Sequence, residues 1–103
     1  MEEIKDKINE IIENIDNTTI LFYQQKIEEG YIQLNTALGL IAQEIICLYQ
    51  YKKENNQLEI DENRLNMMLT EAMQAMENKD LILLADILQY DLKEIFQNIL
   101  NTL

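Results

Sequence analysis

Carboxylates are the main chemical groups that this sequence offers. It contains no histidine and one cysteine, Cys47, while 19 Asp and Glu residues face 8 Lys and Arg residues. Without histidine, imidazole zinc sites, His general bases and the Glu-x-x-His motifs of di-iron bundles are excluded. A glycine-rich phosphate loop is absent, and the acidic segment NNQLEIDEN lacks the glycine and spacing of an EF-hand. We therefore expect no enzyme activity, no cofactor and no metal site.

Asp86 has the most unusual surroundings of any carboxylate, because it is the only charged residue between Leu81 and Leu88. One interpretation is a buried carboxylate with a raised pKa, or one that binds a partner. The other is a residue on the thin solvent-facing edge of its helix, and we favour that one.

Arg64 is the sole arginine of the chain. An antiparallel hairpin centred near Lys79 places position 64 opposite position 94. The sequence therefore predicts an Arg64–Glu94 ion pair, which contributes less than about 1 kcal/mol if it is exposed.

Methionine and tyrosine side chains are the remaining candidates for binding. Four methionines belong to one predicted helix: Met67, Met68, Met73 and Met76. They suit an adaptable binding face, but such residues are more often ordinary core, and we prefer core. Tyr49, Tyr51 and Tyr90 suit either interface anchors or core-edge positions with their hydroxyls in water.

The elements that position these groups are helices. The chain has no proline and two glycines, Gly30 and Gly39, which mark a kink or a close approach of a neighbouring helix. One apolar series repeats every seven residues: Ile20, Ile27, Leu34, Ile41 and Leu48. A second follows four residues behind it, interrupted by Gln24: Tyr31, Leu38 and Ile45. This spacing predicts one long helix that buries a stripe.

The remaining boundaries follow from capping and turn residues. We predict a first helix over residues 2–15, a break at Asp16–Thr19, and the long second helix from about Thr18 to Lys53. A helix that continues through residues 16–19 is the alternative. A loop over 54–60 with Asn55-Asn56 as its turn precedes a third helix, capped by Asp61 and ending near Glu77. Asp80 caps a fourth helix, Leu81 to about Asn101. The predicted fold is all-α, a mostly antiparallel four-helix bundle forming one domain over residues 1–103.

The formal charge of −11 argues against nucleic acid and against anionic membranes as partners. The N-terminal MEEIKDKINEII lacks the apolar core of a signal peptide, and no run approaches the roughly 18 apolar residues of a membrane span. We expect a cytoplasmic location. Cys47 lies within the apolar stripe, so we expect it to be buried as a small apolar residue.

Surplus apolar residues indicate where a partner binds. Phe22, Ile32 and Leu40 lie away from the main stripe, and the segment LILLADIL, with Ile82, Leu83 and Ile87, is apolar almost all round. We predict a non-enzymatic cytoplasmic protein-binding bundle, chaperone- or adaptor-like, that contacts another protein or a second copy of itself. One alternative is a self-associating structural homodimer with no other ligand. Another is an acidic nucleic-acid mimic that blocks a basic protein, although the acids are scattered over every helix.

The C-terminal third carries a resemblance. The segment ENRLNMMLTEAMQAMENKDLILLADILQYDLKEIF resembles the hairpin of uncharacterised small acidic helical proteins of Gram-positive bacteria, in which a pattern like LLADILQYDL recurs. It is also distantly similar to the helical hairpin of flagellar export chaperones. The resemblance implies a cytoplasmic bundle that holds a protein partner, and it assigns no functional residue.

Overall fold

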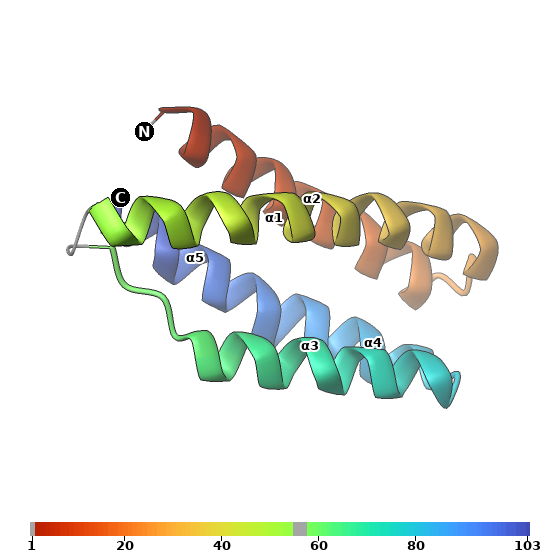
Figure 1. Ribbon diagram of the computed structural model, residues 1–103. Helices are drawn as coiled ribbons and strands as arrows, with labels where there is room; N and C mark the ends of the chain where they lie inside the picture. Colours follow the sequence, from red (N-terminus) through yellow and green to blue (C-terminus); the bar gives the residue numbers. More distant parts are fainter. Residues whose placement is uncertain (1, 55–57) are drawn as a thin grey trace.

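The computed structural model describes residues 2–54 and 58–103, and within them every regular element is a helix. The elements are α1 (Glu2–Tyr23), α2 (Ile27–Glu54), α3 (Glu62–Glu77), α4 (Leu81–Asp86), the π-helical segment η1 (Ile87–Leu92) and α5 (Lys93–Thr102). The last three run on without a break, and we call them together the rod. Figure 1 shows two antiparallel hairpins, α1 with α2 and α3 with the rod. The predicted all-α bundle with a long second helix is confirmed.

Helix α1 passes straight through the predicted break at residues 16–19, so the expected end at residue 15 is wrong. Thr18 and Thr19 are buried there. The Thr18 hydroxyl donates to the carbonyl of Asn14 at 2.7 Å, and the Thr19 hydroxyl donates to that of Asp16 at 3.0 Å. Their hydroxyl groups therefore form hydrogen bonds within the helix, and the preference of threonine for turns does not end the helix here.

The first turn occurs instead at residues 24–26. Gln25 has φ 62°, its N–H donates to the carbonyl of Phe22, and the Lys26 N–H donates to that of Leu21 at 2.8 Å. This bond pair is the Schellman ending of a helix, here with glutamine where glycine is usual. The predicted helix from Thr18 to Lys53 is thus two helices. Ile20 and Ile27 flank the turn and are about half exposed, at 51% and 47%.

The second hairpin turn, at residues 78–80, lies where the sequence predicts it. Lys79 has φ 57°, and the N–H of Asp80 donates to the carbonyl of Ala75 at 2.9 Å. Asp80 then caps α4 by accepting from the Leu83 N–H at 3.1 Å, and Asp61 caps α3 in the same way. Both predicted N-caps are confirmed. The expected turn at Asn55-Asn56 lies outside the described residues, and Glu54 belongs to α2.

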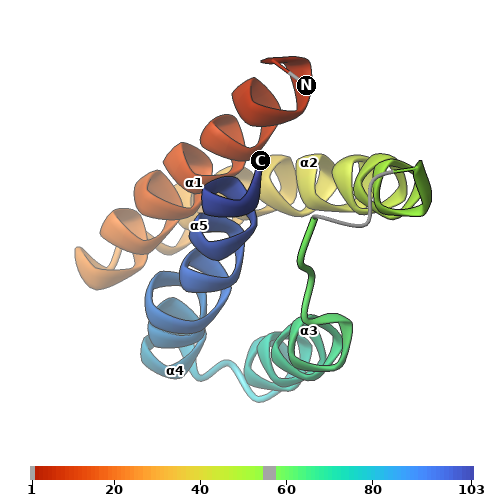
Figure 2. The same ribbon diagram turned by 90° about the vertical axis from the view of Figure 1, so that its left-hand side faces the viewer.

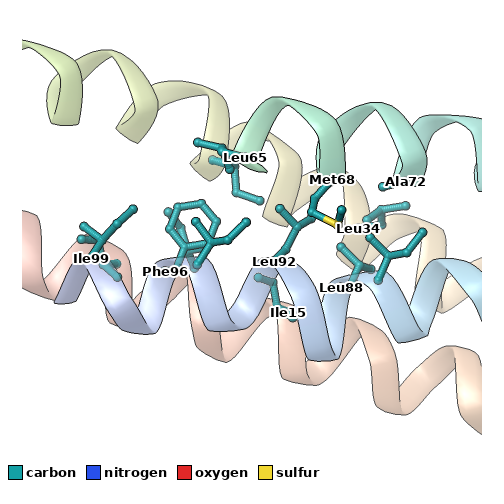
Figure 3. Close-up of a cluster of buried hydrophobic side chains, with 14 of the residues drawn as sticks. Ile15, Leu34, Leu65, Met68, Ala72, Leu88, Leu92, Phe96 and Ile99 are labelled. Carbon is teal, nitrogen blue, oxygen red and sulfur yellow. The ribbon is translucent and has the colours of Figure 1, made fainter. Parts of the chain in front are cut away.

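The core lies where α1 and the rod meet, with α2 packed on α1 and α3 packed on the rod. Figure 3 shows part of the core, in which Ile15 of α1 lies beside Leu92 of the rod and Leu65 and Met68 of α3 face the rod. Figure 2, a view nearly along α3, shows that α2 and α3 stand apart. The bundle is therefore well closed on one side only.

The π-helical segment η1 keeps one row of leucines aligned. Leu84, Leu88 and Leu92 are spaced by four residues, and all three are almost fully buried. The N–H of Lys93 donates to the carbonyl of Leu88, five residues back. A wider turn takes more residues per revolution, so residues four apart drift less around the axis than they do in an α-helix. The predicted fourth helix is present, and its π segment was not predicted.

The two glycines have different surroundings. A Cβ at Gly30 would come within 2.6 Å of the Phe22 ring, so of the two sequence-based interpretations the close approach of a neighbouring helix holds there. A Cβ at Gly39 would meet nothing within 4 Å. Gly30 is therefore required by the fold, whereas Gly39 is not.

Helix α2 is unusually apolar for a helix with so few buried residues. By length and composition alone it is a candidate membrane-crossing helix, contrary to the expectation that no stretch approaches that length. This is a weak indication, since core helices of soluble proteins pass the same test. Of its most apolar 18-residue window, 28% is buried. Much of the apolar surface of α2 is therefore uncovered within the chain.

Candidate functional site

An apolar groove lies between α2 and α3, with a cavity of about 350 Å³. Its walls come from both helices and its floor from the rod. The lining residues are Leu34, Leu38, Ile41, Ala42 and Ile45 of α2, Leu69, Ala72, Met73 and Met76 of α3, and Leu84 and Leu88 of the rod. We call this feature the groove.

The groove exists because each wall helix has more apolar positions than its neighbour covers. On α2, Leu34 and Ile41 are buried, while Leu38 and Ile45 are half-buried and Ala42 is exposed. A stripe this wide is broader than one helix–helix contact needs. On α3, Ala72 is buried and Met73 is 60% exposed. The outer part of both stripes therefore faces the groove.

Beyond one end of the groove, an ion pair links α2 and α3. Lys52 near the end of α2 and Glu62 at the start of α3 form an ion pair at 3.8 Å. Tyr49 is half-buried nearby, and burial, with a smaller contribution from the Glu62 charge, raises the pKa of its hydroxyl. The other end lies toward the start of α2 and the end of α3. The groove is thus tied at one end.

None of the six predicted partner-binding residues lines the groove. Phe22 is 1% exposed, because it lies in α1 and its ring packs edge-on against Tyr31, with 5.4 Å between centroids. Ile87 is 4% exposed, because it faces the core from η1. For these two residues the prediction of an available surface is wrong.

The other four predicted residues are accessible to different extents. Leu40 is half-buried, whereas Ile32, Ile82 and Leu83 are exposed. They lie on α2 and α4, outside the groove. The groove was missed although a signal was present: Leu38, Ala42 and Ile45 widen the stripe of α2 beyond one contact.

The methionines and tyrosines divide between core and surface. Met68 is buried and Met76 is half-buried, as expected for core, whereas Met67 and Met73 are more than half exposed. Tyr49 and Tyr51 are half-buried. Tyr90 is 66% exposed, so it is not a core residue.

The contact between α1 and the rod, which we call the closed seam, carries the polar side chains. Lys93 donates to Asp16 at 2.8 Å, and the Thr19 hydroxyl approaches the Gln89 side-chain oxygen at 3.1 Å. The Tyr23 hydroxyl donates to the carboxylate of Asp86. Asp86 is half-buried and bonded within the chain. Asp86 is therefore neither a fully buried carboxylate nor a residue on a solvent-facing edge, because it faces α1 and accepts from Tyr23.

Tyr23 is the most perturbed titratable group at the closed seam. Burial, the hydrogen bond to Asp86 and the charge of Asp86 raise the pKa of Tyr23 from 10.0 to about 12, with a smaller contribution from Tyr90. A phenol that donates to a carboxylate resists ionisation, because the phenolate would face a like charge. At neutral pH this group is therefore protonated and donates a hydrogen bond to Asp86.

The predicted Arg64–Glu94 pair is confirmed, at 3.4 Å between guanidinium and carboxylate. Arg64 also reaches Asp91 at 3.8 Å. Because these side chains are partly exposed, the cluster is a modest structural contact between α3 and the rod.

A second cavity, of about 360 Å³, lies beside the start of α1 and includes Glu44 and Cys47. Cys47 is exposed, which corrects the expectation of a buried thiol. Glu44 is 8% exposed. Across residues 2–54 and 58–103, no group of three or more His, Cys, Asp or Glu side chains gathers as metal ligands would. Among the described residues, this cavity therefore holds no cluster of metal-ligating side chains.

Fold and groove together define a small helical bundle with an open apolar face. The chain belongs to the family described as Domain of unknown function (DUF8042), whose model matches residues 1–102. No curated protein and no solved structure matches the chain.

Proposed function

We propose that this protein is a non-enzymatic cytoplasmic binding module, chaperone- or adaptor-like, whose groove receives an amphipathic helix of another protein. One observation supports the proposal most: an apolar cavity of about 350 Å³ stays open between two helices of one chain. Burying a large apolar side chain contributes roughly 1.5–3 kcal/mol, so half-covered positions such as Leu38 and Met73 leave binding energy unused. Grooves of this kind bind helices through anchors at i, i+3 or i+4, and i+7.

The dimensions of the groove suit such a ligand. Its α2 wall runs from Leu34 to Ile45, which is about 16 Å of helix. Anchors at i, i+4 and i+7 extend over roughly 10 Å. The cavity has about twice the ~150 Å³ of an engineered apolar cavity that holds benzene. Two or three large apolar side chains would therefore fit.

A designed peptide tests the proposal directly. The peptide carries leucines at i, i+4 and i+7 and a neutral polar face of serine and glutamine, and is titrated into ¹⁵N-labelled protein. We expect saturable amide shifts at Leu38, Ala42 and Met73, with a Kd between about 1 μM and 1 mM.

The chain offers a matched pair of control variants. Met73→Gln changes a groove residue, whereas Met67→Gln changes a methionine of the same helix outside the groove; their exposures are 60% and 52%. We expect Met73→Gln to weaken binding about tenfold, or roughly 1.4 kcal/mol, and Met67→Gln to leave it unchanged. Equal losses in both variants, or no shifts in the groove, would contradict the proposal.

A further inference from the structure

The second cavity, beside the start of α1, contains a carboxylate at a core position. The buried residues of α2 recur at alternating spacings of four and three: Gly30, Leu34, Ala37, Ile41, Glu44 and Leu48. Glu44 is the charged member of this series, and it is 8% exposed. Acidic residues are almost never buried this deeply unless they are paired. An apolar side chain here would continue the stripe, so the carboxylate costs the fold stability.

The Glu44 carboxylate has no partner within residues 2–54 and 58–103. Its side chain forms neither an ion pair nor a hydrogen bond there. In the same part of the chain, every side-chain oxygen or nitrogen that is fully shielded from solvent does have a hydrogen-bond partner. The Glu44 oxygens are therefore not fully shielded, and the opening that Glu44 lines is the second cavity. The carboxylate thus faces this cavity.

The walls of the second cavity suit a cation with an aliphatic body. The lining residues are Glu3, Ile4, Asp6 and Lys7 of α1 and Glu44 and Cys47 of α2. They carry three carboxylates and one ammonium group. That ammonium group, of Lys7, lies 3.4 Å from the carboxylate of Glu10. The local field is therefore negative, while Ile4 and Cys47 provide apolar contact surface.

We infer that the second cavity binds an organic cation, an ammonium group on an aliphatic stem, which pairs with the Glu44 carboxylate. A charge-assisted hydrogen bond to a buried carboxylate is stronger than one in water. The cavity, of about 360 Å³, has more than twice the ~150 Å³ that holds benzene, so a short alkyl stem fits. A bare metal ion does not suit it, because no group of three or more metal-ligating side chains gathers among the described residues. This site is separate from the groove, so the inference goes beyond the proposed function.

Butylamine and butanol test the inference, because they share an alkyl stem and differ in charge. At pH 7 the amine is protonated, as lysine is. Each compound is titrated into ¹⁵N-labelled protein. We expect butylamine to give saturable amide shifts at Ile4, Glu44 and Cys47, with a Kd of about 1–10 mM, and butanol to bind at least tenfold more weakly. Equal binding of the two compounds would overturn the inference, and this comparison needs no variant.

Two glutamate variants separate binding at Glu44 from adhesion to an acidic surface. Glu44→Gln keeps the size of the side chain and removes its charge, whereas Glu13→Gln removes an exposed carboxylate of α1 outside the cavity. Glu44→Gln should weaken butylamine binding at least tenfold, and Glu13→Gln less than twofold. Equal effects of the two variants would contradict the inference. Lys7→Gln removes a like charge from the cavity wall and should strengthen binding about two- to fivefold.

Cys47 gives an independent measurement, because it is the only thiol of the chain and lines the cavity. Bound butylamine should slow the alkylation of Cys47 by iodoacetamide at least twofold in the wild type and leave it unchanged in Glu44→Gln. Unchanged alkylation in the wild type at saturating butylamine would place the amine elsewhere and overturn the inference. The amides of the groove residues Leu38 and Met73 should not shift, so this test and that of the proposed function fail independently.

A free alkylamine and the lysine side chain of another protein carry the same ammonium chemistry. Titration with Nα-acetyl-lysine N-methylamide distinguishes these two sources. Binding as tight as that of butylamine assigns the site to a lysine side chain. Binding at least tenfold weaker than that of butylamine assigns it to free amines. Both results support the inference, whereas shifts from neither amine would overturn it.

Discussion

The two hairpins of this protein meet along two sides, and the two sides differ. At the closed seam, α1 fills the space against the rod with isoleucines, and Lys93–Asp16 and Thr19–Gln89 cross between the helices. At the groove, the Lys52–Glu62 ion pair links α2 and α3, and the apolar walls leave a cavity between them. Closure therefore comes from α1, and α2 contributes surface that the fold does not use.

The largest difference between the two sides should appear on truncating one leucine in each. Leu92 is fully buried against the closed seam, so Leu92→Ala should destabilise the protein by about 2–5 kcal/mol. Leu38 is half-buried in an existing cavity, so Leu38→Ala should cost about 1 kcal/mol or less. Urea unfolding followed by circular dichroism measures both values. Equal losses would mean that the groove is closed in solution.

The two glycines of α2 form the next test. Gly30→Ala drives a Cβ toward the Phe22 ring and should destabilise the protein by about 1–2 kcal/mol, after the gain in helix propensity is subtracted. Gly39→Ala meets open space and should stabilise it by about 0.5–1 kcal/mol. Thermal unfolding of both variants gives the signs. Destabilisation by Gly39→Ala would show that another surface already covers this position.

The Lys93–Asp16 ion pair should make a smaller contribution to the stability of the closed seam. The two side chains are 21% and 37% exposed, compared with 49% and 46% for Lys7 and Glu10 on α1 alone. A double-mutant cycle with Lys93→Met and Asp16→Asn should give a coupling of about 0.5–1 kcal/mol. The cycle for Lys7 and Glu10 should give a value near zero. A coupling free energy near zero in both cycles would show that the Lys93–Asp16 pair does not stabilise the closed seam.

The smallest expected effect is a pH dependence. The pKa of Tyr23 is raised to about 12 in the folded state, whereas the unfolded value is about 10. The folded state therefore holds the phenol proton more tightly. The resulting stabilisation is present below about pH 10 and is lost as the pH rises toward 12. In Tyr23→Phe, stability should fall less between these pH values. Identical slopes in variant and wild type would contradict this assignment.

The parts of the fold that single side chains or short turns determine could be predicted from the sequence. Asp61 and Asp80 were found because an N-cap is a side-chain function. Arg64–Glu94 was found because a tight turn fixes which residues of a hairpin are opposite. The turn at Gln25 was missed because its positive φ has no residue-type signal when glycine and asparagine are absent.

The wide apolar stripe of α2 was a signal for the groove, but the stripe alone does not fix where the uncovered surface lies. Periodicity indicates which residues of a helix are apolar, but the fraction covered depends on how the two hairpins sit against each other. Phe22 illustrates this. The sequence prediction assigned Phe22 to the second helix, on the face that points outward. In the structure Phe22 belongs to α1, before the turn at Gln25, and its ring packs against Tyr31. An error in the position of one helix boundary therefore placed a core residue on the predicted partner-binding surface.

Both hairpin turns lie at the same end of the bundle, away from the end of α2 and the start of α3 (Figure 1). The two hairpins are therefore linked covalently at one end of the bundle only, between α2 and α3. At the turn end their association depends on side-chain contacts, among them Tyr23 with Asp86. Local opening should begin there, because regions without covalent restraint occupy the low-stability end of native-state fluctuations. Amide hydrogen exchange should accordingly quicken along α2 and α3 toward the turns.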